Sequence, residues 1–126
     1  MALLRSLALA GVMAGVAGFA SAAEVKGVLM DKMCSGKAAL RVLSTGIEGG
    51  MIVAEAHTRE CALMPACQKS GYGVYTSDNK FLSFDEAGNR KALEAIKASK
   101  KLDDLEVEIS GEVKGDTIKV ETLKLL

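Results

Sequence analysis

The clearest alternation of apolar and polar positions lies near the end of the chain. From residue 105 to residue 113, apolar residues or glycine take every second position, and three glutamates stand among the polar positions between them. A period of two is typical of a strand with one buried and one solvent-facing side. Gly115-Asp116 then predicts a two-residue hairpin turn, and a last strand follows from Ile118. The apolar positions of that strand change phase, which predicts a bulge near Glu121-Thr122.

Three more strands and one helix are expected earlier in the chain. Apolar positions separated by single polar ones predict a first strand over residues 25–33. Residues 73–76 and 80–84 flank a polar cluster, which is typical of a second hairpin. After this hairpin, Asn89 is expected to cap a helix that runs from residue 90 to about residue 100.

The expected order of elements is strand, long insertion, strand, strand, helix, strand, strand. Five strands with a helix between the third and the fourth is the element order of an OB-fold. We therefore predict a mostly β domain, a small five-stranded OB-like barrel with a helical insertion between strands one and two. A generic α+β sheet is the alternative, because the order of elements does not determine which strands pair.

The start of the chain has the composition of a cleavable signal peptide, assigned to residues 1–23. One basic residue precedes an apolar run over residues 7–19, and small residues follow it. The run has 13 residues, fewer than the roughly 20 that span a bilayer. We therefore expect cleavage after Ala22 or Ala23 and no membrane span afterwards. The expected product is a periplasmic or secreted single domain over residues 24–126.

Charge and aromatic content narrow the classes of partner. The 16 acidic residues match the 16 basic ones, and the sequence has no basic stripe of the kind that nucleic-acid binding requires. Two tyrosines, three phenylalanines and no tryptophan are too few for a platform on which bases or sugars stack. We therefore expect no nucleic-acid partner. The sequence does not identify the binding partner, and a protein of the cell envelope is one candidate.

The residues that carry chemistry are concentrated in the insertion between the first two strands. All three cysteines and the single histidine of the chain lie there. Gly49-Gly50 predicts the start of a helix and Pro65 predicts its end. On that helix His57 and Cys61 are four positions apart and Met64 follows three positions later, so the three are expected to share one face.

A soft-metal site is one interpretation of these residues. Cys67 is expected in the loop after the helix and Cys34 at the end of the first strand. With His57 and Cys61 they would supply three thiolates and one imidazole, a set that suits tetrahedral zinc. Thiolates with Met64 as an additional ligand would suit copper(I). The chain has no C-x-x-C motif, and the five residues between Cys61 and Cys67 exceed the usual spacing of about two to four.

A disulfide is the competing interpretation of the same cysteines. Export places the domain in an oxidising compartment, where cysteines pair by default. Cys34, Cys61 and Cys67 allow three pairings, and each of them leaves one thiol over. The sequence does not choose between a disulfide with a spare thiol and a metal site.

A thiol-dependent enzyme is the third interpretation, with Cys61 as nucleophile and His57 as base. Such pairs are catalytic when a third group orients the base and an oxyanion site faces the thiol. The sequence identifies neither feature. We therefore predict no catalytic residue and expect that the protein is not an enzyme.

The spacing of these residues resembles that of a loose group of small exported bacterial proteins. Members carry a strand ending in D-x-x-C, then H-x3-C-A, then C-x-x-x-G and a strand–turn–strand. Here Asp31 and Cys34 match the first element, His57 and Cys61 the second, and Cys67 the third. The resemblance covers nearly all of the chain after the leader. It implies an OB-like fold and that the three cysteines and the histidine belong together, and it implies no activity.

The expected function is that of a small exported binding module for a soft metal ion or a small ligand. In OB-folds the loop between strands one and two helps to frame the ligand site, and the Cys/His insertion occupies that position. The alternative is a disulfide-stapled envelope domain with a structural or interaction role and no metal. Zinc and copper are the cofactors considered.

Overall fold

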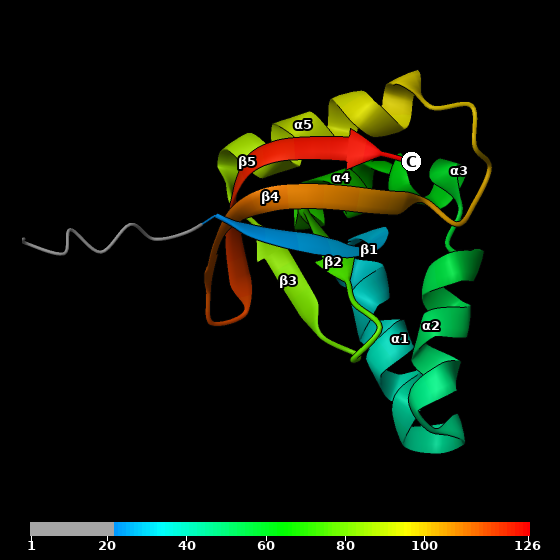
Figure 1. The fold of residues 1–126 in the computed structure, drawn as a ribbon. Helices are drawn as coiled ribbons and strands as arrows, with labels where there is room; N and C mark the ends of the chain where they lie inside the picture. Colours follow the sequence, from blue (N-terminus) through cyan, green and yellow to red (C-terminus); the bar gives the residue numbers. More distant parts are fainter. Residues whose placement is uncertain (1–21) are drawn as a thin grey trace, which may run out of the picture.

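The computed structural model describes residues 22–126 (Figure 1). The signal peptide predicted over residues 1–23 lies almost wholly outside the described residues. The first strand begins at Ala23, at the predicted end of the leader. Within residues 22–126, no helix combines the length and the apolar character needed to cross a membrane.

Five strands form one hydrogen-bonded sheet. Its members are β1 (Ala23–Asp31), β2 (Tyr72–Tyr75), β3 (Phe81–Phe84), β4 (Glu106–Lys114) and β5 (Thr117–Leu125). Neighbouring strands follow the order β1-β2-β3-β5-β4, and β1 also pairs with β4, so that the sheet closes on itself. The β3–β5 pair is parallel and the other pairs are antiparallel.

The last hairpin confirms the prediction made from the alternating pattern. β4 and β5 pair along almost their whole length, and Gly115 turns the chain between them with a positive φ of 59°. Ser110 pairs with Thr122 whereas Gly111 pairs with Val120, which leaves Glu121 as an extra residue. This irregularity is the bulge that the phase change predicted.

A helix joins β3 to β4 as predicted, but its start differs. This helix, α5, spans Glu86–Ala98, and its N-cap is Asp85, whose side chain accepts a hydrogen bond from the backbone of Gly88. The prediction that Asn89 caps the helix was therefore wrong. Asn89 lies inside α5 and accepts a hydrogen bond from the backbone N–H of Tyr72 instead.

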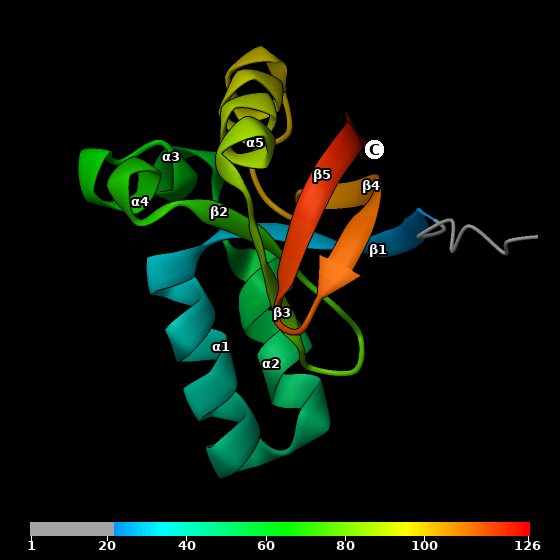
Figure 2. The same ribbon diagram turned by 90° about the vertical axis from the view of Figure 1, so that its left-hand side faces the viewer.

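The insertion between β1 and β2 contains four helices rather than one. They are α1 (Lys32–Thr45), α2 (Ile47–Ala56), α3 (Arg59–Ala62) and α4 (Pro65–Ser70). The predicted single helix from Gly49-Gly50 to Pro65 was wrong, because the chain becomes extended at His57 and Thr58 and Pro65 begins α4. α1 and α2 form a helical hairpin that extends away from the sheet, at the opposite end of the molecule from α5 (Figures 1 and 2).

The domain is a small mixed α/β domain. Helices hold more of residues 22–126 than strands do, so the proportion of β structure is lower than the predicted mostly β class. The difference comes from the insertion, where α1 and α2 account for most of the additional helix.

Two apolar clusters cover the two sides of β1. Leu29 points into the larger cluster, which β4, β5 and α5 complete. Val28 and Met30 point the other way and pack with Cys34 and Cys67 of the insertion. The end of β1 is therefore buried on both faces, and the predicted ligand residues lie in the second cluster.

Gly27 of β1 provides a test of this close packing. Replacing Gly27 by Ala should lower the free energy of unfolding by about 1–3 kcal/mol, the usual effect of overpacking. The added Cβ would lie 2.3 Å from the carbonyl oxygen of Tyr75 and 2.7 Å from Cγ2 of Val74. The matched control is Gly36→Ala in α1, where the added Cβ meets no atom within 4 Å.

Alanine is preferred over glycine inside a helix by about 1 kcal/mol, so Gly36→Ala should be at least as stable as the wild type. Urea denaturation of both variants measures the difference. Equal stability of the Gly27 and Gly36 variants would contradict the close approach of β2 to Gly27.

Candidate metal centre

Asp31 organises the start of the insertion. It is the last residue of β1 and the N-cap of α1, and its side chain is fully buried. Its Oδ2 accepts a hydrogen bond of 2.8 Å from the backbone N–H of Cys34. A capping carboxylate satisfies one of the free N–H groups of a first helical turn. Asp31 therefore fixes Cys34 in the first turn of α1, directly beside the end of the sheet.

The other oxygen of Asp31 holds the only histidine. Oδ1 of Asp31 lies 2.7 Å from Nε2 of His57, and both side chains are buried. Burial raises the pKa of Asp31, but the hydrogen bonds from His57 and from the backbone of Cys34 more than offset this and hold the pKa below its ordinary value. An ionised carboxylate only accepts hydrogen bonds, so the shared hydrogen belongs to Nε2.

The second ring nitrogen of His57 has no partner. Nδ1 is buried and makes no hydrogen bond within residues 22–126. When the hydrogen of a neutral imidazole is on Nε2, Nδ1 carries a lone pair. Buried polar atoms are almost always paired, so an unpaired one needs an explanation such as a bound ion. Metal-binding histidines commonly donate their other N–H to a carboxylate, as His57 does to Asp31.

Two thiols stand beside this imidazole. Sγ of Cys34 lies 3.9 Å from Sγ of Cys61. The ligand atoms of Cys34, His57 and Cys61 all lie within 4.8 Å of one another, which would allow them to hold a metal ion together. Cys61 is in the short helix α3, where Thr58 caps the chain by accepting a hydrogen bond from the backbone of Cys61.

A second group overlaps the first. Asp31, Cys34 and Cys67 also bring their ligand atoms within 4.8 Å of one another, and all three residues are buried. Cys67 lies in α4 rather than in the predicted loop. It is therefore a neighbour of Cys34 and Asp31 and not a member of the group that contains His57. All three cysteines are free thiols in the described part of the chain.

The surroundings of Cys34 and Cys67 oppose thiolate formation at these two residues in the absence of a cation. Burial raises the pKa of Cys34, and the nearby Asp31 carboxylate raises it further. The same two causes raise the pKa of Cys67. Burial, Asp31 and Cys67 together raise the pKa of Tyr72 to about 12. Metal coordination reverses this effect, because a coordinating thiol is deprotonated.

The site is reached from a surface hollow of about 340 Å³. The end of β1, the α1–α2 hairpin and the start of α3 surround it. The residues that line it are Met30, Cys34, Lys37, Val53, Ala56, His57, Thr58 and Cys61. Cys34 and His57 are buried at this hollow, whereas Cys61 is partly exposed. An ion or a small molecule could therefore approach the thiols from this side.

Met64 is placed elsewhere. The break at His57 and Thr58 removes the single helical face on which Met64 was expected to join His57 and Cys61. Met64 is 52% exposed, and it lines a different hollow together with Arg59 and Leu63.

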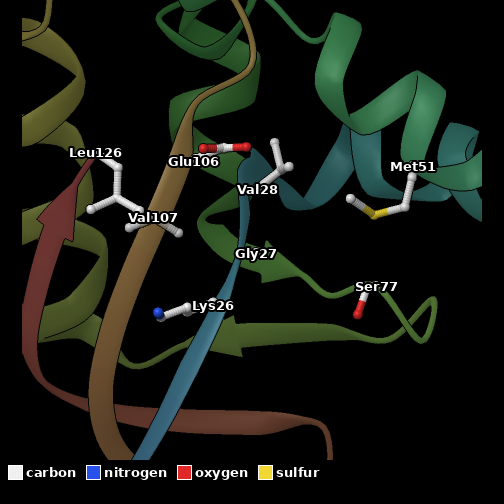
Figure 3. A pocket seen from close by; sticks show the side chains of 8 residues that line it. All are labelled: Lys26, Gly27, Val28, Met51, Ser77, Glu106, Val107 and Leu126. Carbon is white, nitrogen blue, oxygen red and sulfur yellow. The ribbon is translucent and has the colours of Figure 1, made fainter.

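Another hollow, of about 280 Å³, lies along β1 and β4 (Figure 3). Its polar side chains are those of Lys26, Ser77 and Glu106. Figure 3 shows them spread along the two strands and the β2–β3 turn rather than directed at one point. The chemical groups of this hollow therefore do not converge as those of the Cys/His hollow do.

Asp31 is a residue of the candidate site that sequence reasoning did not include among the site residues. The first strand was expected to continue to residue 33, which would place Asp31 inside it. The available signal was the spacing of Asp31 and Cys34, since an aspartate three residues before a helical position is a common N-cap.

Comparison of the chain with protein-family models, with curated proteins and with solved structures found no match. The chemistry of the site is therefore inferred from its own geometry.

Proposed function

We propose that the protein is a small binding domain for a soft metal ion, Zn²⁺ or Cu⁺, held by Cys34, His57 and Cys61. The observation that carries the proposal is an imidazole with a buried, unpaired Nδ1, one ring nitrogen of which lies within 4.8 Å of the sulfurs of two free thiols. Thiolate and imidazole are the ligands that these two ions prefer. Asp31 would orient the imidazole from its other side, as carboxylates do in many metal sites.

The separation of the two sulfurs supports this proposal. Two thiolates on one tetrahedral zinc ion, each about 2.3 Å from the metal, lie about 3.8 Å apart. The sulfurs of Cys34 and Cys61 are 3.9 Å apart. The thiols therefore already stand at the spacing of two ligands of one ion, and little movement would be needed on binding.

Three protein ligands leave one position of a tetrahedral ion free. Cys61 is partly exposed at the hollow, so the free position would face that side. A site with three protein ligands and one open position can exchange its fourth ligand, whereas a structural zinc site has four. The domain is therefore proposed to bind and release its ion or a small ligand of the ion, rather than to use the ion only for folding.

We also infer an OB-like barrel as the architecture that presents this site. The closed strand order, the parallel β3–β5 pair and the position of α5 between β3 and β4 support it. The loop between the first two strands of an OB-fold helps to frame its ligand site, and here that loop carries every proposed ligand. Export to the periplasm or the medium is part of the proposal and is supported by the composition of residues 1–23.

Metal titration of the reduced protein tests the proposal. The wild type should bind one equivalent of Zn²⁺ or Cu⁺ in competition with a chromophoric chelator. His57→Ala should weaken binding by more than about 100-fold, because even the loss of a residue that only supports a ligand costs about 10–100-fold. Cys34→Ser and Cys61→Ser should show losses of the same order.

Cys67→Ser is the matched control. It removes a thiol that lies near Cys34 but outside the group with His57, and its affinity should stay within a few-fold of the wild type. Native mass spectrometry gives an independent measure of the bound ion. If the reduced wild type binds neither ion, or if His57→Ala binds as tightly as the wild type, the proposal is wrong.

A further inference from the structure

We infer that Cys61 and Cys34 also form a redox-active pair that exchanges with small disulfides, with Cys61 as the attacking thiol and Cys34 as the resolving thiol. This activity does not depend on a metal ion. It uses the same hollow, and it would take a low-molecular-weight disulfide as its substrate class.

Exposure assigns the two roles. Cys34 and Cys67 are 6% and 4% exposed, whereas Cys61 is partly exposed and lines the hollow. A disulfide that enters the hollow therefore meets Cys61 most readily. Once Cys61 has reacted, Cys34 is the thiol recorded next to it, with its sulfur 3.9 Å away. Attack by that sulfur needs a further approach of only about 2 Å to reach the length of a disulfide bond.

His57 is the group proposed to activate the thiol, and one of its ring nitrogens lies within 4.8 Å of the Cys61 sulfur. Thiol–imidazole pairs become nucleophilic when a third residue orients the imidazole. Asp31 does so for His57 through the 2.7 Å contact to Nε2, which leaves the unpaired Nδ1 to accept a proton. Asp31 is the third group that the sequence alone did not identify.

The exchange proceeds in two balanced steps. Cys61 gives its proton to Nδ1 of His57, and its sulfur attacks one sulfur of a disulfide R–S–S–R. The S–S bond breaks, a Cys61–S–S–R bond forms, and the first R–S⁻ takes the proton from His57 and leaves as R–SH. Cys34 then gives its proton to His57, which is neutral again after the first step, and its sulfur attacks the Cys61 sulfur. The Cys61–S–S–R bond breaks, a Cys34–Cys61 disulfide forms, and the second R–S⁻ takes the proton from His57 and leaves as R–SH. The protein has lost two electrons and two protons, and one disulfide has become two thiols.

The test uses the reduced, metal-free full chain and oxidised glutathione as the probe. The folded wild type should lose two hydrogens by mass and release two equivalents of glutathione, and peptide mapping should find a Cys34–Cys61 disulfide. Cys34→Ser should instead accumulate a stable mixed disulfide at Cys61. Cys61→Ser should form neither product.

Two more variants separate this inference from general thiol chemistry. Cys67→Ser, the matched control, should react like the wild type. His57→Ala should react about 100-fold more slowly when folded, which is the usual contribution of a general base, and at the wild-type rate in urea. A mixed disulfide at Cys67 in the Cys34 variant, or equal folded rates for wild type and His57→Ala, would overturn the inference.

The metal-binding proposal and the disulfide-exchange proposal can fail separately. The exchange is measured on the metal-free protein, and the metal titration is carried out without any added disulfide. If both hold, oxidation of Cys34 and Cys61 removes both sulfur ligands and should release the ion. A protein that binds metal but does not react with glutathione disulfide would retain the metal proposal and overturn this one.

Discussion

Replacing Asp31 by Ala should lower the free energy of unfolding by about 3–5 kcal/mol, because two buried donors that lose their acceptor cost about 1–3 kcal/mol each. The side chain is fully buried and accepts hydrogen bonds from His57 and from the backbone of Cys34. Without it both donors stay buried and unpaired, and α1 loses its N-cap. Urea denaturation at neutral pH in the presence of a chelator measures the loss.

Asp31→Asn is the matched control for charge. It keeps the shape of the side chain and one acceptor for the backbone of Cys34, so its loss of stability should be smaller than that of Asp31→Ala. Its effect should also depend on pH. In the wild type, the hydrogen bonds to Asp31 outweigh burial and hold its pKa below the ordinary value of 3.8.

A carboxyl whose pKa is lower in the folded than in the unfolded chain stabilises the fold above the unfolded pKa. That contribution is lost as the pH falls through the folded pKa. The stability difference between the wild type and Asp31→Asn should therefore be complete at neutral pH and shrink below about pH 4. A difference that stays constant into acid would show that the ionised carboxylate is not its source.

Tyr72→Ala should lower the free energy of unfolding by a similar amount, about 3–5 kcal/mol, as is usual for truncation of a buried aromatic ring. The ring is 2% exposed and belongs to the larger apolar cluster. Its hydroxyl donates a hydrogen bond of 2.6 Å to the carbonyl oxygen of Ala62. Tyr72 therefore connects the sheet to α3, the helix that carries Cys61.

Tyr72→Phe separates the ring from the hydroxyl. It retains the packed ring and should cost about 1 kcal/mol, the net value of one hydrogen bond. Because the lost bond is the one to α3, Tyr72→Phe should also speed amide exchange in α3 more than in β4. Equal stability losses for Tyr72→Ala and Tyr72→Phe would show that the ring contributes little to the core.

The β4–β5 hairpin at the end of the chain could be predicted from local sequence, because its two strands are consecutive and pair with each other. The alternation over residues 105–113 and Gly115-Asp116 determine a hairpin whose strands are neighbours in the chain. The change of phase located the extra residue Glu121 for the same reason. Closure of β1 onto β4 joins residues far apart in sequence, and no local pattern carries that information.

The insertion was predicted less well because its buried positions are small and its large apolar side chains are exposed. In α1 the buried residues are Cys34, Ser35 and Ala38, whereas Leu40 and Leu43 are 66% and 85% exposed. A helix of this kind shows no apolar stripe toward the core. The break after α2 has no glycine or proline at His57 or Thr58, although Thr58 does provide an N-cap for α3.

The membership of the candidate site could be predicted more fully than its geometry. Concentration of all three cysteines and the histidine in one insertion indicated four residues whose ligand atoms the structure brings together in two overlapping groups, one of which also contains Asp31. The prediction that His57, Cys61 and Met64 share one helical face was wrong for Met64, because the helix breaks at His57 and Thr58. Cys34 and His57 come together through their shared contacts with Asp31. The contacts of the buried Asp31 carboxylate with Cys34 and His57 are visible only in the structure. In the sequence, the one trace of them is the three-residue spacing of Asp31 and Cys34.

The point where the insertion leaves the sheet has a consequence for the history and the engineering of this domain. Asp31 and Tyr72 face each other as paired residues of β1 and β2, so the chain leaves the sheet and returns to it at the same place. The four helices α1 to α4 therefore form one continuous segment whose two ends are neighbours in the sheet. Such a segment can be acquired, lost or transplanted in one genetic step while every strand keeps its neighbours. The proposed ligands Cys34, His57 and Cys61 all lie in this segment, whereas Asp31, which contacts two of them, belongs to the sheet.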